Sequence, residues 1–178
     1  MSTNADQAIG AAVRQIEHHL QQAEHQARFI AARIEKGEVD PNNRKSFDLL
    51  LTGALAAAPQ IEAVILIKPD LHALAFGRDR ERDQIALNDF DYSADPIVRA
   101  SMAAIGPGAS WGARIWREGF KKTYLKLAYP VVRDGVPVGA VFAVVSVEQL
   151  SSFVSTVGAG HAGTRFILYG RSPMGATR

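Results

Sequence analysis

Basic and aromatic side chains are concentrated in residues 109–135, where the chain is best equipped for binding chemistry. This stretch has six basic residues and two acidic ones, whereas residues 37–108 have seven basic and eleven acidic. In β-strands, alternation places Arg114 and Trp116 on one face, and Tyr124 and Lys126 together on one face. A cation beside an aromatic ring suits a small anion. Because Lys126 interrupts an otherwise apolar strand, we favour an anion pocket over the alternative, a solvated sheet face.

Other chemical motifs in the sequence are weaker. The run Gly158-Ala-Gly160-His-Ala-Gly163 matches G-x-G-x-x-G, but a dinucleotide site needs a strand before it and a helix after it. The order expected here is reversed, so we interpret this run as a flexible turn. His18, His19 and His25 are not spaced at i, i+4 and are read as solvated helix residues. Asp89, Asp91 and Asp95 lack the glycine and glutamate of a calcium loop. We predict no metal site and no cofactor.

The composition excludes several classes of protein. The 178 residues are 47% hydrophobic and 21% charged, as in one ordinary globular domain. There is no cysteine, so thiol catalysis, Cys-ligated zinc and disulfides are excluded. The formal net charge of +2 is small for a nucleic-acid binder, and we expect no nucleic-acid partner. No apolar run reaches the roughly 20 residues needed to cross a bilayer.

Helical patterns dominate the first third of the chain. Two series of apolar residues at seven-residue spacing predict one long helix from about Asp6 to Lys36, stopped by Gly37. Its narrow stripe fits either a coiled-coil seam or an ordinary helix packed on a sheet, and both descriptions could hold along different stretches. A second helix is predicted at 43–58. A third is expected at 95–105, with Asp95 as its N-cap and a proline at its first position.

The rest of the chain has the pattern of antiparallel strands. Strands are predicted at 61–68, 71–76, 111–117, 123–132, 136–147 and 165–169, with a brief helix at 148–157. Asp134-Gly135 is a strong hairpin signal. Residues 77–93 are expected to form a polar loop. Helices first and hairpin-linked strands later predict an α+β fold with one antiparallel sheet.

This order of elements resembles the bacterial Cache family, the PDC-like, PAS-related extracytoplasmic sensor domains. The resemblance spans residues 8–171. It rests on Ala63-Val-Ile-Leu-Ile-Lys-Pro-Asp70, Leu127-Ala-Tyr-Pro-Val-Val-Arg-Asp-Gly135, Gly139-Ala-Val-Phe-Ala-Val-Val-Ser-Val147, Glu148-Gln-Leu150 and Gly163-Thr-Arg-Phe-Ile-Leu-Tyr-Gly170. It looks most like the sensor regions of transmembrane adenylate or guanylate cyclases, followed by histidine kinases and chemoreceptors. The chain matches only the first lobe of the family's two-lobed form.

The resemblance implies a ligand site, and the differences between this sequence and the family's pattern indicate a different ligand. The family's amino-acid binders have an Arg-x-Trp-Tyr run and an aspartate at the positions matched here by the stretch from Tyr92 to Val98 and by Val144. An α-amino acid is therefore disfavoured. The pocket position that often holds threonine is Lys126, which favours a carboxylate.

The sequence thus predicts a PAS-like central antiparallel sheet with a long N-terminal helix packed along it. Residues 1–37 would form a signalling and dimerisation helix, 38–171 the sensor lobe and 172–178 a polar tail. We expect a periplasmic, non-catalytic sensor domain, homodimeric through its first helix, cut from a membrane-anchored receptor. A dimerisation module that binds no ligand is the alternative. The predicted ligand-binding residues are Tyr92, Arg114, Trp116, Tyr124 and Lys126.

Overall fold

A computed structural model describes residues 2–79, 84–118 and 121–158 of the chain. Its helices are α1 (Ser2–Glu35), α2 (Arg44–Ala57), α3 (Pro96–Ala103) and α4 (Val147–Gly158). Its strands are β1 (Ala63–Ile67), β2 (His72–Asp79), β3 (Gln84–Asp91), β4 (Ser110–Trp111), β5 (Ile115–Arg117), β6 (Lys122–Arg133) and β7 (Val136–Ser146). The predicted strand at 165–169, the glycine turn after Gly158 and the predicted tail at 172–178 lie outside the described residues.

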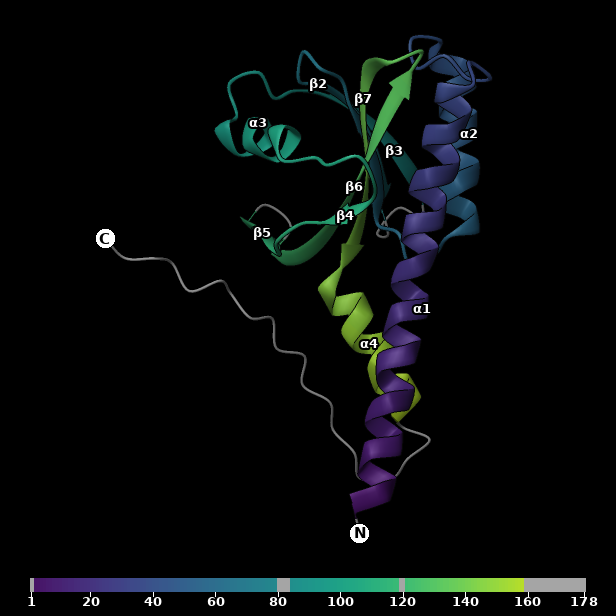
Figure 1. The fold of residues 1–178 in the computed structure, drawn as a ribbon, viewed down its shortest axis with the longest axis vertical. Helices are drawn as coiled ribbons and strands as arrows, with labels where there is room; N and C mark the ends of the chain where they lie inside the picture. Colours follow the sequence, from purple (N-terminus) through teal and green to yellow (C-terminus); the bar gives the residue numbers. More distant parts are fainter. Residues whose placement is uncertain (1, 80–83, 119–120, 159–178) are drawn as a thin grey trace, which may run out of the picture.

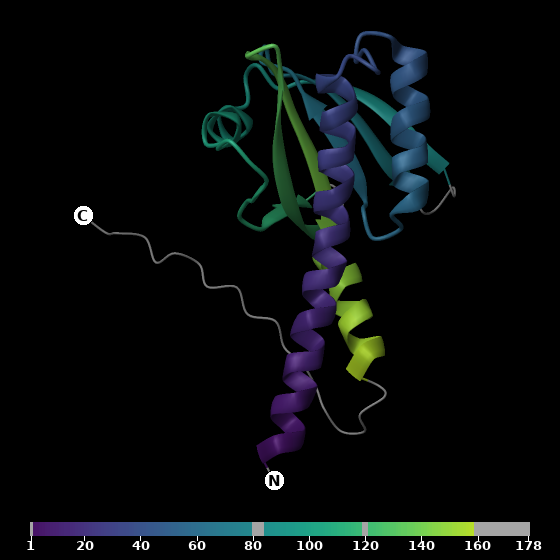
Figure 2. The same ribbon diagram turned by 45° about the vertical axis from the view of Figure 1, so that its right-hand side comes forward.

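The strands form one antiparallel sheet in the order β3-β2-β1-β7-β6-β4, with β5 also paired to β6. Helices α1 and α2 cover one face, and α3 lies on the other side of the sheet (Figure 1). Viewed from an angle, α1 crosses the sheet lengthwise and continues well beyond it, where α4 lies beside it (Figure 2). The predicted α+β class, a PAS-like antiparallel sheet with a long N-terminal helix packed along it, is confirmed.

The main core lies between α1, α2 and the sheet. Strand alternation sends Val64 and Leu66 of β1, Leu127 of β6 and Val141 of β7 into this layer, where at most 1% of each residue is exposed. Phe47 of α2 meets the ring of Phe76 edge-on, with 6.0 Å between the ring centroids. Burying a large apolar side chain of this kind contributes about 1.5–3 kcal/mol.

The apolar stripe of α1 has two environments. Ala23, Ala27, Ile30 and Ile34 are fully buried against the sheet. In contrast, Ile9 and Val13, nearer the N-terminus, remain 52% and 47% exposed. The helix ends at Glu35, just before Gly37, which was predicted to stop it; the φ of Gly37 is 70°, which suits glycine, and its N–H donates to the carbonyl of Ile34. The second half of the stripe is therefore an ordinary core-facing surface, and a seam between two copies stays a prediction for the first half.

Local turn and cap signals were read correctly. Asp134 and Gly135 have φ values of 51° and 77° in the two-residue turn between β6 and β7, as a type I′ hairpin requires. The Asp95 side chain accepts hydrogen bonds from the N–H groups of Ile97 and Val98 at the start of α3. Asn43 caps α2 in the same way.

The prediction of a polar loop at 77–93 was wrong, because most of this stretch belongs to β2 and β3. Strand β2 continues to Asp79, and β3 pairs with it along its whole length, from His72 opposite Asp91 to Asp79 opposite Gln84. The reason is the alternation of Ile85 and Leu87, whose side chains pack against the main core. Nearby charged residues obscured this short apolar pattern.

Candidate functional site

The candidate site lies on the face of the sheet opposite α1. A second, smaller apolar cluster covers this face and includes Phe142 of β7, Ala128 of β6 and Val98 of α3. The partly buried Tyr92, Met102 and Ile105 pack against it. Residues after β3 and in α3 therefore cover the sheet face to which Tyr124 and Lys126 belong by alternation.

Lys126 brings a charged group into contact with this cluster. It lies opposite Val144 of β7, and its Nζ is 5.5 Å from the centroid of the Phe142 ring. The residue Lys126 as a whole is half-buried, and Phe142 is 3% exposed. A cation over an aromatic face in partly desolvated surroundings is electrostatically favourable.

Tyr92 approaches the same face from the loop between β3 and α3. Its N–H donates to the carbonyl of Leu71 at 3.0 Å, and its carbonyl accepts from the N–H of Asp95 at 2.9 Å. Its ring stacks on Phe90, with centroids 5.6 Å apart. The loop position of Tyr92 is therefore set by backbone hydrogen bonds, and its side chain belongs to the cluster beneath α3.

A different arrangement holds Arg114 and Trp116. The prediction of a single strand at 111–117 was wrong. Two short strands, β4 and β5, lie there instead, and each pairs separately with β6. Trp111 lies opposite Leu127 and Ile115 opposite Tyr124, so three edge residues span two residues of β6. One extra residue in an edge strand acts as a bulge and reverses the alternation of side chains.

The bulge separates the predicted site residues into two sets. Ile115, rather than Trp116, lies opposite Tyr124, and Trp116 lies opposite Thr123 on the other face. Trp116 is 54% exposed, and its Nε1 donates to Glu118 at 2.6 Å. Arg114 is exposed in the connection between β4 and β5. The fold thus brings Tyr92, Tyr124 and Lys126 to one face, and places Trp116 out of register with them.

An apolar groove of about 650 Å³ lies on the other side of the sheet, between α1 and α2. Its walls include Phe29, Leu49 and Ala54. It does not include any predicted site residue, and its lining suits apolar contact better than an anion.

Within the described ranges, no group of three His, Asp or Glu residues is arranged to hold a metal ion. Among the same residues, no helix is both long and apolar enough to span a membrane.

Solved structures with the same arrangement are sensory domains of receptors. The sensory domain of the Campylobacter jejuni chemoreceptor Tlp3 superposes with a TM-score of 0.67 at 11% identity, over 85% of this chain and 62% of that chain. The extracellular domain of a protein described as a histidine kinase, vpHK1S-Z8, gives 0.72 at 12% identity, over 85% and 61%. This chain has their fold.

A further matching structure is described as a complex with a bound ligand. It is the ligand-binding domain of the amino acid chemoreceptor PctC of Pseudomonas aeruginosa PAO1 in complex with GABA, with a TM-score of 0.61 at 15% identity, over 91% of this chain and 69% of that chain. No protein-family model and no curated protein sequence matches. The chain spans less than two thirds of the Tlp3 and vpHK1S-Z8 domains. The resemblance to cyclase sensor regions stays a prediction.

Sequence reasoning missed two features of the site. Phe142 was read only as part of an apolar strand, although its register opposite Ala128 puts it within reach of Lys126. The alternation of β7 could have placed Phe142 and Val144 on one face. For the bulge at 112–114 the sequence had a weaker signal, Gly112, because a glycine in an edge strand often marks a bulge. In the structure the N–H of Gly112 donates to the carbonyl of Lys126 at 2.8 Å.

Proposed function

We propose that this chain is the ligand-sensing part of a bacterial extracytoplasmic receptor and that it binds a small carboxylate-bearing metabolite. The observation that supports the ligand class is Lys126, a half-buried residue whose Nζ lies 5.5 Å from the Phe142 ring, beside an apolar cluster. Such a face favours a ligand with an apolar body and one anionic group. The fold shared with receptor sensory domains supports the sensing role.

The binding site of the proposal is centred on Lys126, Tyr124 and Tyr92. Lys126 would form the ion pair with the ligand carboxylate, while the two tyrosines would shape the cavity and limit access of water. Arg114 and Trp116 belong to the proposed site only if the ligand or a rearrangement of the edge brings them to the same face. The domain is proposed to act by binding and not by catalysis.

A thermal-shift screen of small mono- and dicarboxylates tests the proposal. A ligand at about 100 times its Kd should stabilise the protein by about 2.7 kcal/mol, which raises the Tm by about 5–10 °C for a domain of this size. Lys126→Met should abolish the response, and Lys45→Met, which removes an exposed lysine on α2, should not. The ligand class is refuted if no carboxylate stabilises the wild type. A full response in Lys126→Met would show that Lys126 is not the anion-binding group.

The exposed apolar residues of α1 favour a second candidate function, dimerisation without a ligand. Ile9 and Val13, near the N-terminus of α1, are 52% and 47% exposed. Two copies could bury these residues as a coiled-coil seam. The double substitution Ile9→Asp and Val13→Asp should then convert a dimer to a monomer in light-scattering measurements. Thermal shifts with carboxylates would separate the two candidates, because only the sensor responds to them.

A further inference from the structure

The carboxylate of Glu62 is buried at the end of the sheet where α4 begins. Glu62 immediately precedes β1 and is 8% exposed. Its N–H donates to the carbonyl of Val144 at 2.8 Å, and its carbonyl accepts from the N–H of Arg78 at 2.9 Å. The backbone of Glu62 is therefore held between two neighbouring strands. A carboxylate so buried is retained only where partners compensate its desolvation.

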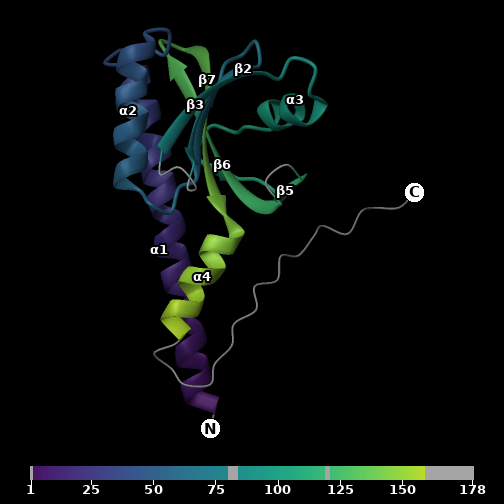
Figure 3. The same cartoon turned by 180° about the vertical axis from the view of Figure 1, so that it is seen from behind.

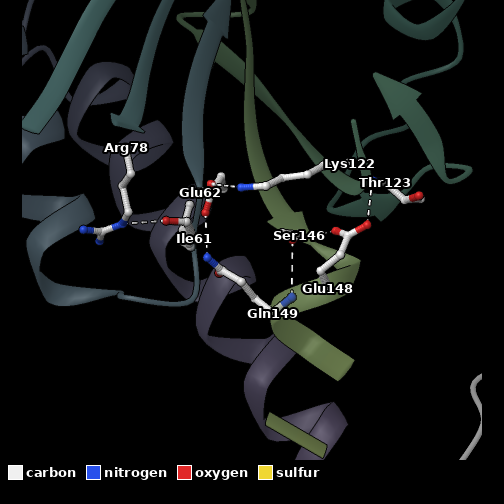
Figure 4. Close-up of polar contacts among 8 residues, drawn as sticks. All are labelled: Ile61, Glu62, Arg78, Lys122, Thr123, Ser146, Glu148 and Gln149. Carbon is white, nitrogen blue, oxygen red and sulfur yellow. Dashed lines mark hydrogen bonds and ion pairs between the residues drawn. The ribbon is translucent and has the colours of Figure 1, made fainter. Parts of the chain in front are cut away.

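Two of those partners come from different elements. One carboxylate oxygen accepts a hydrogen bond from Nε2 of Gln149 in α4 at 2.8 Å. The other lies 3.7 Å from Nζ of Lys122, the first residue of β6. Figure 4 shows Glu62 between these two side chains. A single carboxylate thus connects the start of β1, the start of β6 and the first turn of α4.

A second set of contacts joins α4 to β6 and β7. The Ser146 hydroxyl donates to Glu148 at 2.8 Å and accepts from the N–H of Gln149 at 3.3 Å, which caps α4. The other Glu148 oxygen accepts from the N–H of Thr123 at 3.1 Å. Partial burial acts to raise the pKa of Glu148. The hydrogen bonds to its carboxylate and the charge of Lys122 outweigh that effect, and the pKa falls below its usual value.

These contacts are continuous with the candidate binding face. Ser146 lies opposite Tyr124 in the β6–β7 ladder, and Val144 lies opposite Lys126. Lys122 is four residues before Lys126 in the same strand. A shift of the first residues of β6 therefore acts directly on the groups that hold α4.

We propose that Glu62 is a latch: it holds α4 on the sheet and couples the position of α4 to the start of β6. The latch is a property of the ligand-free domain. Its use in carrying a binding signal to α4 rests on the proposed function. Glu62 is a positioning residue, since it acts through Lys122 and Gln149.

Gln149→Glu tests the contact between the sheet and α4. The substitution replaces the amide donor with a second carboxylate facing Glu62. The loss of a hydrogen bond to a charged group changes the equilibrium constant for the opening of α4 by a factor of about 10–100. Amide hydrogen exchange in residues 150–158 should accelerate by that factor, while exchange in β1 is unchanged. Ser151→Ala is the matched control, because the Ser151 hydroxyl donates to Val147 within α4 itself. It should change exchange by less than about twofold.

A reciprocal swap distinguishes the latch from a general loss of stability. In the double variant Glu62→Gln and Gln149→Glu, the donor and acceptor exchange places, so exchange in α4 should be slower than in Gln149→Glu alone. It should stay faster than in the wild type, because the ion pair with Lys122 is lost with the Glu62 carboxylate. If the double variant exchanges as fast as Gln149→Glu alone, the direct contact is refuted. Unchanged exchange in Gln149→Glu would overturn the proposal as well.

Lys122→Met tests the coupling to β6. It should accelerate exchange in α4 when Gln149 is present and have little further effect in a Gln149→Ala background. Equal effects in both backgrounds would refute the coupling.

A distance measurement between α1 and α4 adds a second readout. The chain has no cysteine, so nitroxides at Gln15→Cys and Ser152→Cys can report the α1–α4 distance, whose distribution should broaden in Gln149→Glu. All of these measurements use ligand-free protein. A failed ligand screen would therefore refute the sensor function alone, and a failed swap would refute the latch alone.

Discussion

Replacing Arg78 with methionine should lower the free energy of unfolding by about 3 kcal/mol. The Arg78 guanidinium donates from Nε to the carbonyl of Ile61 at 2.9 Å, and from Nη2 to the carbonyls of Ala58, at 3.2 Å, and Leu55. These carbonyls belong to the end of α2 and the turn that leads into β1. A hydrogen bond from a charged group contributes about 1.5–3 kcal/mol. Because Arg78 is only half-buried, we take about 1 kcal/mol for each of the three acceptors.

Urea denaturation followed by circular dichroism measures this effect. With a slope near 2 kcal/mol/M, the loss corresponds to a midpoint lower by about 1.5 M. Arg78→Lys keeps the positive charge near the helix C-terminus but cannot reach three carbonyls at once, so about half the loss should remain. Arg28→Met is the matched control. Arg28 is 54% exposed in its ion pair with Glu24, so its removal should cost less than about 1 kcal/mol.

The reasoning is refuted by either of two results. A midpoint for Arg78→Met within about 0.3 M of the wild type would mean that water satisfies the three carbonyls equally well. Full stability of Arg78→Lys would mean that charge alone, without the planar fork of donors, secures the end of α2.

Three other substitutions have definite expected outcomes. Gly139→Ala should destabilise the protein by more than about 2 kcal/mol in urea melts, because the φ of Gly139 is 146° and a Cβ there would lie 2.3 Å from the Ile67 carbonyl oxygen. Arg133→Ala should accelerate amide exchange in the last turn of α1, since Arg133 donates from Nε to the Ile34 carbonyl at 3.0 Å; unchanged exchange would contradict this. The prediction that His19 is solvated was wrong, because His19 is partly buried on α1. This burial, with a smaller contribution from the charge of His18, lowers the pKa of His19 below 6.5. The unfolded chain then binds more protons, so stability falls as the pH drops through 6.5, and His19→Gln should make the urea midpoint less sensitive between pH 7 and 5.5.

The parts of the fold that sequence could predict are those with a local physical cause. Asp95 before a proline, Gly37 after the long stripe and Asp134-Gly135 between apolar runs each specify backbone angles or a cap without help from distant residues. They were therefore placed correctly. Strand β3 was missed because its main support is non-local: Ile85 and Leu87 matter only once β2 is beside them.

The candidate site shows the same limit more sharply. Tyr124 and Lys126 belong to one long regular strand, so alternation alone placed them together. The face on which Trp116 lies depends on how the edge residues pair with β6. The extra residue of the bulge shows only when the two strands are paired, so the sequence of the edge strand alone does not reveal it. Glu62 falls within the strand predicted at 61–68 and had no signal of its own, because its partners Lys122 and Gln149 are far away in sequence.

The placement of α1 and α4 determines how the domain would respond to a mechanical load. The start of α1 and the end of α4 lie at the same end of the molecule, and α4 lies against α1 just below the sheet (Figure 3). Force applied between these two points would peel the helices apart one contact at a time and would hardly strain the ladder between β6 and β7. The sheet would keep its shape while α4 moved. Under such a load the side chains around Glu62 would keep the first turn of α4 on the sheet while the rest of α4 separated from α1.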